Sequence, residues 1–166
     1  MTYSGEKKIE VSAILPVLNE EKTIGLCIRK IREVFGKENI SGEIIVVDNG
    51  SEDDSKSIAT KEGAIVVHEE HKGYGAAYLR GLREARGKYI IMGDADNTYD
   101  FYDIPKFLKP LGEGYEFVMG SRFKGKIQKG AMSWSHRYIG NPILSGLCRL
   151  FFHTKLSDIH CGMRAF

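Results

Sequence analysis

Three acidic residues follow one apolar stretch: Asp94, Asp96 and Asp100 stand at the end of Tyr89–Asp100, YIIMGDADNTYD. Carboxylates placed this close repel one another, so a positive partner is expected among them. Oxygen ligands suit hard cations, which favours Mg²⁺ or Mn²⁺ bound by Asp94 and Asp96, with Thr98 as a further oxygen ligand. A lone D-x-D is common in acidic surface loops, but its position directly after an apolar strand favours the metal site.

A second polar group, Asp48-Asn49-Gly50-Ser51, follows the apolar run Glu43–Asp48. A carboxylate at a strand end can accept a hydrogen bond from a nucleobase N–H, and a polar turn leaves backbone groups free for a ligand. An ordinary turn with Asp48 as a helix N-cap explains the same residues equally well. No G-x-G-x-x-G follows the first apolar run, so NAD binding loses its main support.

The segment His68–Gly75, HEEHKGYG, combines two histidines with a glycine-rich turn. The zinc motif H-E-x-x-H places its histidines four residues apart on a helix, whereas His68 and His71 are three apart in an expected loop, so zinc is not expected. Gly73-Tyr74-Gly75 suits a helix start at which the backbone approaches a bound ring or phosphate, although an ordinary helix start fits too.

Arginines at three positions are candidates for binding phosphate. Arg122 follows an expected strand, and Arg137 and Arg164 lie in the polar segments beyond it. A guanidinium offers a planar fork for phosphate oxygens. Most of the 24 lysines and arginines must lie on the solvated surface. Arg122 alone is singled out by its position, directly after an expected strand.

Alternating strand and helix patterns position these residues. Strands are expected at Ile9–Pro16, Glu43–Asp48, Ala64–His68 and Lys88–Gly93. The expected helices run from Asn19-Glu20-Glu21 to Gly36, from the NGSEDDS turn to about Glu62, and over Gly73–Arg86 with Ala76, Leu79, Leu82 and Ala85 on one face. This alternation predicts a mostly parallel α/β sheet with helices on both faces, and such sheets bind ligands outside the carboxyl ends of their strands.

The second half of the chain has weaker patterns. A short helix is expected at Ile104–Leu111 and a strand at Tyr115–Met119, whereas the last residues, CGMRAF, show no closing helix or strand. We therefore expect one domain over residues 1–166, truncated at its C-terminus. The apolar stretch Tyr138–Phe152 is interrupted by polar residues and is shorter than the ~20 residues of a membrane span.

The composition limits the class of protein. The chain has 42% hydrophobic and 28% charged residues, which is typical of a soluble globular protein. Its net charge of +2 lacks the basic excess of nucleic-acid binders. The three cysteines are widely spaced and no secretory signal precedes the first strand, which favours the cytoplasm.

Several motifs in the same order resemble glycosyltransferase family 2: LPVLNEEKTI, VVDNGSEDDS, GYGAAYLRGL, the DAD of MGDADNTYD, GSRFKG and SDIHCGMRAF. They look most like the branch that moves a hexose from a nucleotide sugar to polyprenyl or dolichyl phosphate. The resemblance implies a GT-A fold, a UDP- or GDP-hexose donor, and a divalent cation, Mg²⁺ or Mn²⁺, on the D-x-D motif. Leu18, where many relatives have an aromatic, and Thr98, where dolichyl-phosphate mannose synthases commonly have Gln, depart from the pattern.

The same resemblance implies roles for individual residues. The residues implied to bind the donor are Pro16, Asn19, Glu20, Asp48, Asn49, Lys72, Gly73, Tyr74, Gly75, Asp94, Ala95, Asp96 and Arg122, with Arg137 and Arg164 as further phosphate contacts. Inverting in-line attack is implied, with Asp96 and Arg122 stabilising the leaving group. A lipid phosphate is already anionic and needs no strong base. For a hydroxyl acceptor Asp158 is the candidate base, and a structural role for Asp158 is an equal alternative.

A lipid acceptor also requires contact with a membrane, expected at its cytoplasmic face. The basic loop Lys124–Lys129 and the apolar face of Ile139, Ile143, Leu144, Leu147 and Phe151 suit shallow insertion, and a core or oligomer contact fits that face equally well.

Other functions remain possible from the residues. A non-catalytic nucleotide-sugar-binding module and a transferase to a sugar hydroxyl use the same donor site. A nucleotidyltransferase lacks support, because its glycine-rich basic loop is replaced by the acidic PVLNEE.

Overall fold

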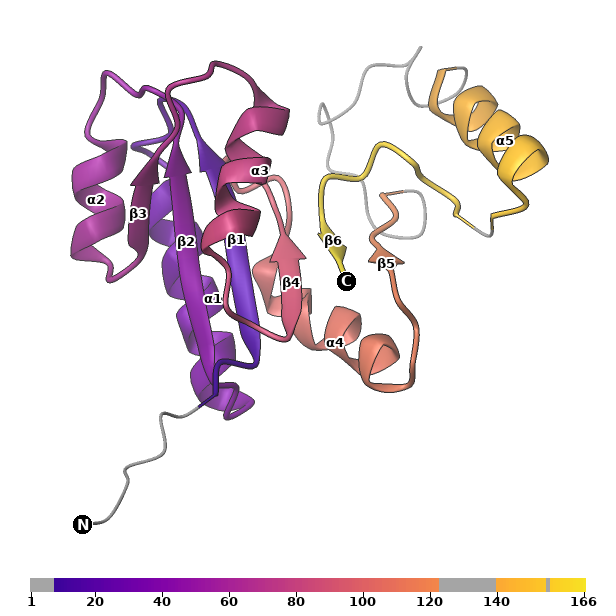
Figure 1. The fold of residues 1–166 in the computed structure, drawn as a ribbon, viewed down its shortest axis with the longest axis horizontal. Helices are drawn as coiled ribbons and strands as arrows, with labels where there is room; N and C mark the ends of the chain where they lie inside the picture. The colour runs from indigo at the N-terminus through magenta and orange to yellow at the C-terminus, as the bar shows by residue number, and fades with distance from the viewer. Residues whose placement is uncertain (1–7, 123–139, 155) are drawn as a thin grey trace.

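A single mixed sheet forms the centre of the protein. The computed structural model describes residues 8–122, 140–154 and 156–166, and within them the six strands follow the order β3-β2-β1-β4-β6-β5 (Figure 1). β1 to β4 are mutually parallel where they pair, and β6 runs antiparallel to both β4 and β5. The strands are β1 (Val11–Val17), β2 (Gly42–Asp48), β3 (Ile65–His68), β4 (Tyr89–Met92), β5 (Val118–Met119) and β6 (Arg164–Ala165).

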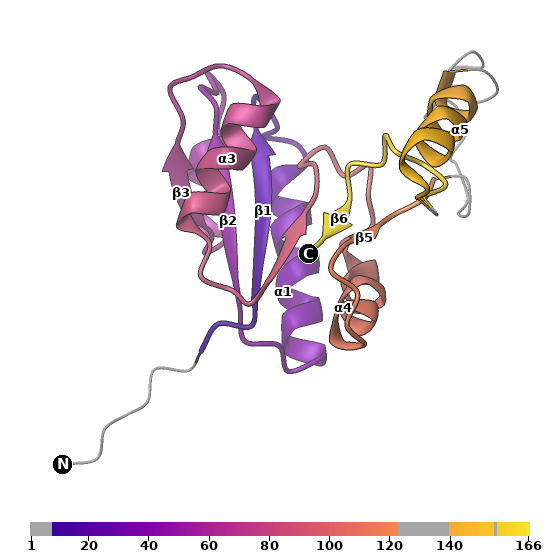
Figure 2. The same cartoon turned by 45° about the vertical axis from the view of Figure 1, so that its right-hand side comes forward.

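Helices cover both faces of this sheet, as the alternating pattern predicts. In Figure 1, α3 (Tyr74–Glu84) lies in front of the sheet and α1 (Ile24–Lys37) behind it, and Figure 2 shows the same layers after rotation. The helices α2 (Ser55–Lys61) and α4 (Ile104–Gly112) pack into the same core as α1, and the short 3-10 helix η1 (Phe101–Asp103) precedes α4.

Alternate residues of β1 serve two separate cores. Ala13 and Leu15 join the core on the α1 side, whereas Ile14 packs with Ile45 and Val47 beneath α3. All five side chains are fully buried. Strands buried on both faces have no polar side, which explains their nearly continuous apolar sequence.

The C-terminal segment differs from the prediction. Residues expected to lack a closing strand form β6, which lies between β4 and β5 and pairs Arg164 with Met92 and Met119. A two-residue strand is too short for any alternating pattern, and its identity depends on the two strands that flank it. The neighbouring β5 is also shorter than the predicted strand at 115–119.

The buried face of α3 was predicted only in part: Leu82 and Ala85 pack against the core as expected. Leu79, expected on the apolar face, is 58% exposed, while Ala77, Tyr78 and Gly81 are buried. Gly81 packs directly against Ile14 of β1, and this close contact with the sheet leaves no space for a larger side chain.

The start and end of α1 also differ slightly from the prediction. The helix begins at Ile24 after Thr23, and it continues one residue past Gly36. Asn19, expected at the helix start, has a φ of 59° and belongs to the preceding loop. Its side-chain oxygen accepts a hydrogen bond from the Glu52 N–H at 2.9 Å, so it joins two loops instead of capping the helix.

Gly81→Ala is expected to destabilise the protein by about 2 kcal/mol, the usual range for overpacking a buried contact. A Cβ at this position would lie 2.4 Å from Cγ2 of Ile14 and 3.1 Å from Cγ2 of Val47. Gly36→Ala in α1 is the matched control, because its Cβ would meet nothing within 4 Å. Chemical denaturation measures both variants, and a Gly81→Ala protein as stable as the wild type would contradict this packing.

The last helix, α5 (Asn141–Phe152), lies away from the four parallel strands in both views (Figures 1 and 2). Its exposed apolar residues are Ile143, Leu144, Leu147, Leu150, Phe151 and Phe152. Ile139 and the loop at 124–129, which belong to the predicted membrane contact, lie outside the described residues. In the described part of the chain, every helix is too short or too polar to span a bilayer.

Candidate functional site

A cavity of about 330 Å³ opens at the carboxyl ends of the parallel strands. Residues after β1, β2 and β4 and at the start of α3 meet there, as expected for an open α/β sheet. The lining residues are Pro16, Val17, Leu18, Glu20, Asn49, Lys72, Gly73, Tyr74, Ala77, Asp94, Ala95 and Asp96. The sequence therefore identified most of this lining, including both aspartates of the D-x-D motif.

The two aspartates enter the cavity from the loop after β4. Asp94 is partly buried and accepts a hydrogen bond from the Tyr74 hydroxyl at 2.6 Å, whereas Asp96 is exposed and accepts one from the Thr98 N–H at 2.8 Å. Burial raises the pKa of Asp94, and the negative charge of Asp96 raises it further, against the Tyr74 hydrogen bond. A cation between the carboxylates would relieve this repulsion.

Residues of α1 fix the D-x-D loop from behind. Lys30 donates to the Asn97 side chain at 3.0 Å, and Asn97 has a φ of 61°, the left-handed region that asparagine tolerates. The buried Cys27 thiol donates to the Ala95 carbonyl at 3.4 Å, and burial raises the pKa of Cys27 to about 11, so the thiol keeps its proton. Sequence reasoning missed Lys30 and Cys27, because about 70 residues separate them from the loop and no local pattern links the segments.

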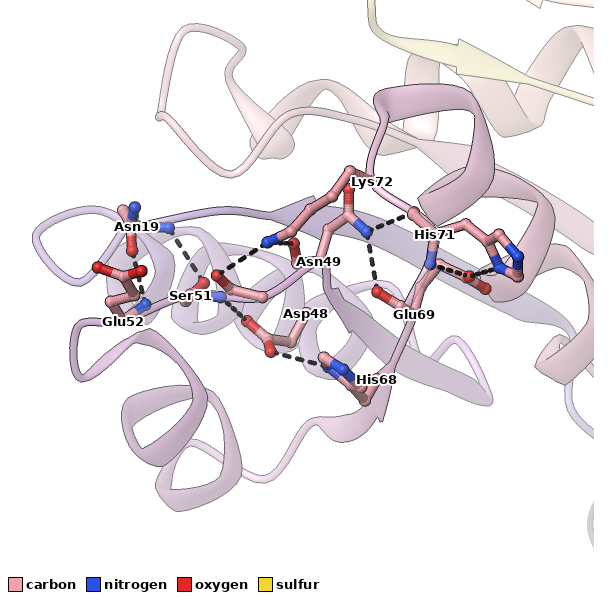
Figure 3. A network of polar contacts seen from close by, with 10 residues as sticks. Asn19, Asp48, Asn49, Ser51, Glu52, His68, Glu69, His71 and Lys72 are labelled. Carbon is pink, nitrogen blue, oxygen red and sulfur yellow. Dashed lines mark hydrogen bonds and ion pairs between the residues drawn. The ribbon is translucent and has the colours of Figure 1, made fainter.

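Asn49 holds the loop between β3 and α3 against the cavity (Figure 3). Its amide nitrogen donates to the carbonyls of Glu69 and His71 at 2.9 and 2.8 Å, and its oxygen accepts from the Gly73 N–H at 2.8 Å. The Lys72 ammonium donates to the Asn49 carbonyl at 3.1 Å. Asn49 therefore positions both residues of the cavity lining, Gly73 through its side chain and Lys72 through its backbone carbonyl.

Asp48 lies behind this wall and is not among the lining residues. Its buried carboxylate accepts from the Ser51 N–H at 3.0 Å and contacts Nδ1 of His68 at 3.2 Å (Figure 3). Burial opposes ionisation, but the hydrogen bonds from Ser51 and His68 outweigh it and leave the pKa of Asp48 below its usual range. Asp48 thus orders the turn at 48–51, and its contact with a base stays a prediction.

Besides Asp48 and the pair Arg122 and Asp158 described below, three loop or helix residues predicted for the site are absent from the cavity lining. They are Asn19, Gly75 and Thr98, and their predicted contacts remain predictions.

Arg122 and Asp158 form an ion pair, and neither is among the residues that line the cavity. Nε and Nη2 of Arg122 donate to Oδ2 and Oδ1 of Asp158 at 2.7 and 2.8 Å, and the backbone N–H of Arg122 donates to Oδ2 at 3.1 Å. The Asp158 side chain has no exposed surface. Burial opposes ionisation, but the Arg122 hydrogen bonds outweigh it and hold the pKa of Asp158 below its usual range. Asp158 as a base and Arg122 as a phosphate ligand remain predictions.

The C-terminal segment brings a further cation towards Asp94. A Cβ at Gly162 would lie 2.5 Å from Oδ2 of Asp94, so only glycine allows this close approach. Arg164 in β6 donates through Nε to the Cys161 carbonyl at 2.9 Å, and its charge favours ionised Asp94. Arg137 lies outside the described residues.

Comparison with known sequences agrees with the resemblance that the motifs indicate. The family model described as Glycosyl transferase family 2 matches residues 12–166. The low-salt glycan biosynthesis hexosyltransferase Agl6 of Haloferax volcanii is 43% identical over 94% of this chain and 38% of its own length. The dolichyl-phosphate hexose transferase of the same organism is 30% identical over 95% of this chain and 66% of its own length. The chain thus spans 38 to 66% of these two relatives.

Solved structures share the fold. Mannosyl-3-phosphoglycerate synthase from Rubrobacter xylanophilus has a TM-score of 0.76 and 26% identity, over 95% of this chain and 52% of that one. Glucosyl-3-phosphoglycerate synthase from Mycobacterium tuberculosis, in complex with Mn²⁺ and UDP-glucose, has a TM-score of 0.73 and 27% identity, over 95% of this chain and 55% of that one. The mostly parallel sheet with helices on both faces is therefore the GT-A fold that the motifs implied.

Proposed function

Because the chain belongs to glycosyltransferase family 2, we propose that the protein transfers a hexose from a nucleotide sugar to a polyprenyl or dolichyl phosphate. One observation carries the proposal: Asp94, Asp96, Lys72 and Asn49 surround a single cavity at the carboxyl edge of the sheet. Carboxylates for a cation, an ammonium for phosphate and apolar walls for a nucleoside are the groups that a nucleotide-sugar donor requires.

Asp94 and Asp96 are the residues that would hold Mg²⁺ or Mn²⁺. No group of three or more histidine, cysteine or acidic side chains suited to a metal occurs within the described residues. A pair of carboxylates fits such an ion when substrate phosphates and water complete its shell. Once bound, the ion supplies positive charge that stabilises the diphosphate leaving group. The Mn²⁺ in the complex of the mycobacterial synthase supports this assignment.

The nucleoside would occupy the apolar part of the cavity. Its apolar lining comes from Pro16 and Val17 at the end of β1, Leu18 directly after it, and Ala77 of α3. Lys72 also lines the cavity, and its ammonium, which donates to the Asn49 carbonyl, would bind a phosphate oxygen. The UDP-glucose bound by the mycobacterial synthase favours a UDP-hexose over a GDP-hexose as donor.

A lipid phosphate is the acceptor that the chemistry favours. Both oxygens of Asp158 already accept hydrogen bonds from Arg122, which suits a reaction without a strong base. Similarity to a dolichyl-phosphate hexose transferase supports the same acceptor. The exposed apolar residues of α5 would rest on the membrane that contains the lipid, at its cytoplasmic face. In-line attack by the lipid phosphate would invert the anomeric centre.

Incubating the protein with UDP-glucose or GDP-mannose, and with either dolichyl phosphate or a soluble sugar, tests the proposal. We expect a hexosyl lipid to form in Mn²⁺ and not in EDTA, and NMR of the product would report its anomeric configuration. Donor binding without turnover would instead indicate a binding module, and transfer only to the soluble sugar would identify a hydroxyl acceptor. Failure to bind any nucleotide in a thermal-shift scan would reject the donor site.

A further inference from the structure

The phenol of Tyr74 contacts the carboxylate that begins the D-x-D motif. Its hydroxyl donates to Oδ1 of Asp94 at 2.6 Å, and both residues line the cavity. A hydrogen bond from a neutral donor to a carboxylate is short and strong at this distance. The contact joins the first residue of α3 to the loop after β4, two segments that are 20 residues apart.

Tyr78, one helical turn further along α3, braces the Tyr74 ring. The two rings meet edge to face with centroids 4.8 Å apart, and their hydroxyls lie 3.4 Å apart. Tyr78 is buried against the sheet, so it provides a fixed support, whereas Tyr74 is 55% exposed. The aromatic contact therefore restricts the rotation that would carry the Tyr74 hydroxyl away from Asp94.

The other oxygen of Asp94 is confined by the C-terminal segment. The backbone of Gly162 approaches so closely that a Cβ there would lie 2.5 Å from Oδ2 of Asp94 and 3.0 Å from the Tyr99 ring. The Gly162 N–H donates to the Tyr99 hydroxyl at 2.7 Å, which fixes this approach. Asp94 is thus held between α3 on one side and the C-terminal segment on the other.

We propose that Tyr74 is a positioning residue that sets the orientation of Asp94 for binding a divalent cation. The inference rests on the proposed function, and it assigns to Tyr74 a role beyond flanking the nucleoside. The Asn49 side chain accepts a hydrogen bond from Gly73, the residue before Tyr74. Asn49, Gly73, Tyr74 and Asp94 therefore form one connected series of contacts along the cavity. Tyr74 acts through Asp94 and takes no part in the transfer itself.

Tyr74→Phe tests the inference, because it removes the hydroxyl and keeps the ring. Titration of Mn²⁺ followed by its EPR signal, in the presence of UDP, should show about 10-fold weaker Mn²⁺ binding, as for other groups that orient a metal ligand. UDP binding in EDTA should stay within about twofold of the wild type, since the phenyl ring still packs at the cavity. Tyr102→Phe is the matched control, because its hydroxyl donates to Glu33 at 2.7 Å outside the cavity lining.

The outcomes separate this inference from the proposed function. If the wild-type protein does not bind Mn²⁺, the proposed metal site is wrong. The positioning role of Tyr74 is then wrong too, before any variant is compared. If the wild type binds Mn²⁺ and Tyr74→Phe binds it equally well, Tyr74 does not position Asp94. Equal losses in Tyr74→Phe and Tyr102→Phe, or a loss explained by a lower melting temperature, would also overturn the inference. A loss confined to Mn²⁺ binding by Tyr74→Phe supports it.

Discussion

Asp96→Ala is expected to reduce hexose transfer by about 100-fold or more, because it removes one of the two carboxylates proposed to hold the cation at the diphosphate. Donor binding that depends on Mn²⁺ should be lost with it. The fold should be unaffected: Asp96 is exposed, and the hydrogen bond that it accepts within the described residues is a local one, from the Thr98 N–H two residues on. Calorimetric titration of UDP with Mn²⁺ or EDTA, together with a transfer assay, measures both effects.

Asp103→Asn provides the control for the loss of an acidic side chain. Asp103 pairs with Lys106 on the surface and is not among the residues that line the cavity. The Asp103→Asn protein should retain wild-type donor binding, since an exposed ion pair contributes little to the stability of the fold. Unchanged Mn²⁺-dependent binding in Asp96→Ala would remove Asp96 from the metal site and weaken the proposed mechanism as a whole.

Asp158→Asn is expected to lower the free energy of unfolding by about 3 kcal/mol, because breaking a buried ion pair leaves its partner without compensation. Arg122 would lose its orientation, so transfer should fall for lipid-phosphate and hydroxyl acceptors alike. A role as general base predicts a different result, in which only the hydroxyl acceptor is affected. Denaturation curves and the two transfer assays distinguish these roles, with Asp103→Asn again as the control.

The dependence on pH provides a further check on this ion pair. Burial opposes ionisation of Asp158, but the Arg122 hydrogen bonds outweigh it, so its folded-state pKa lies below that of the unfolded chain. The stabilisation is then fully present above the unfolded pKa and is lost as pH falls through the folded pKa. The difference in stability between wild type and Asp158→Asn should therefore narrow in acid. A difference that does not change with pH would indicate that packing, and not charge, is what the substitution disturbs.

Local features of the sequence account for the predictions that the structure confirms. The apolar runs and the helices between them specify β1 to β4 and the helices on both faces, because periodicity reports which side chains a segment must bury. Parallel strands place their carboxyl ends at one edge, so Asp94, Lys72 and Asn49 could be expected to share a site. The short apolar run before Asp94 was sufficient to place the D-x-D motif at that edge.

Other contacts depend on segments that are distant in the chain. β6 has only two residues and exists because β4 and β5 provide hydrogen-bonding edges on both sides. The pairing of Arg122 with Asp158 spans 36 residues, and it gives the candidate base a structural partner that no local pattern indicates. The orientation of α3 on the sheet likewise depends on a distant contact, because Gly81 packs closely against Ile14 of β1.

The order of strands β1 to β4, the helices between them and the acidic character of the site could be predicted from the amino-acid sequence, since burial periodicity and strand-end carboxylates are properties of short segments. The pairing of side chains became apparent only in the folded protein: Tyr74 with Asp94, Arg122 with Asp158, and Asn49 with the loop at 69–73. Such pairs depend on the packing of whole elements, because hydrogen bonds act over about 3 Å and form only after distant segments have been brought together.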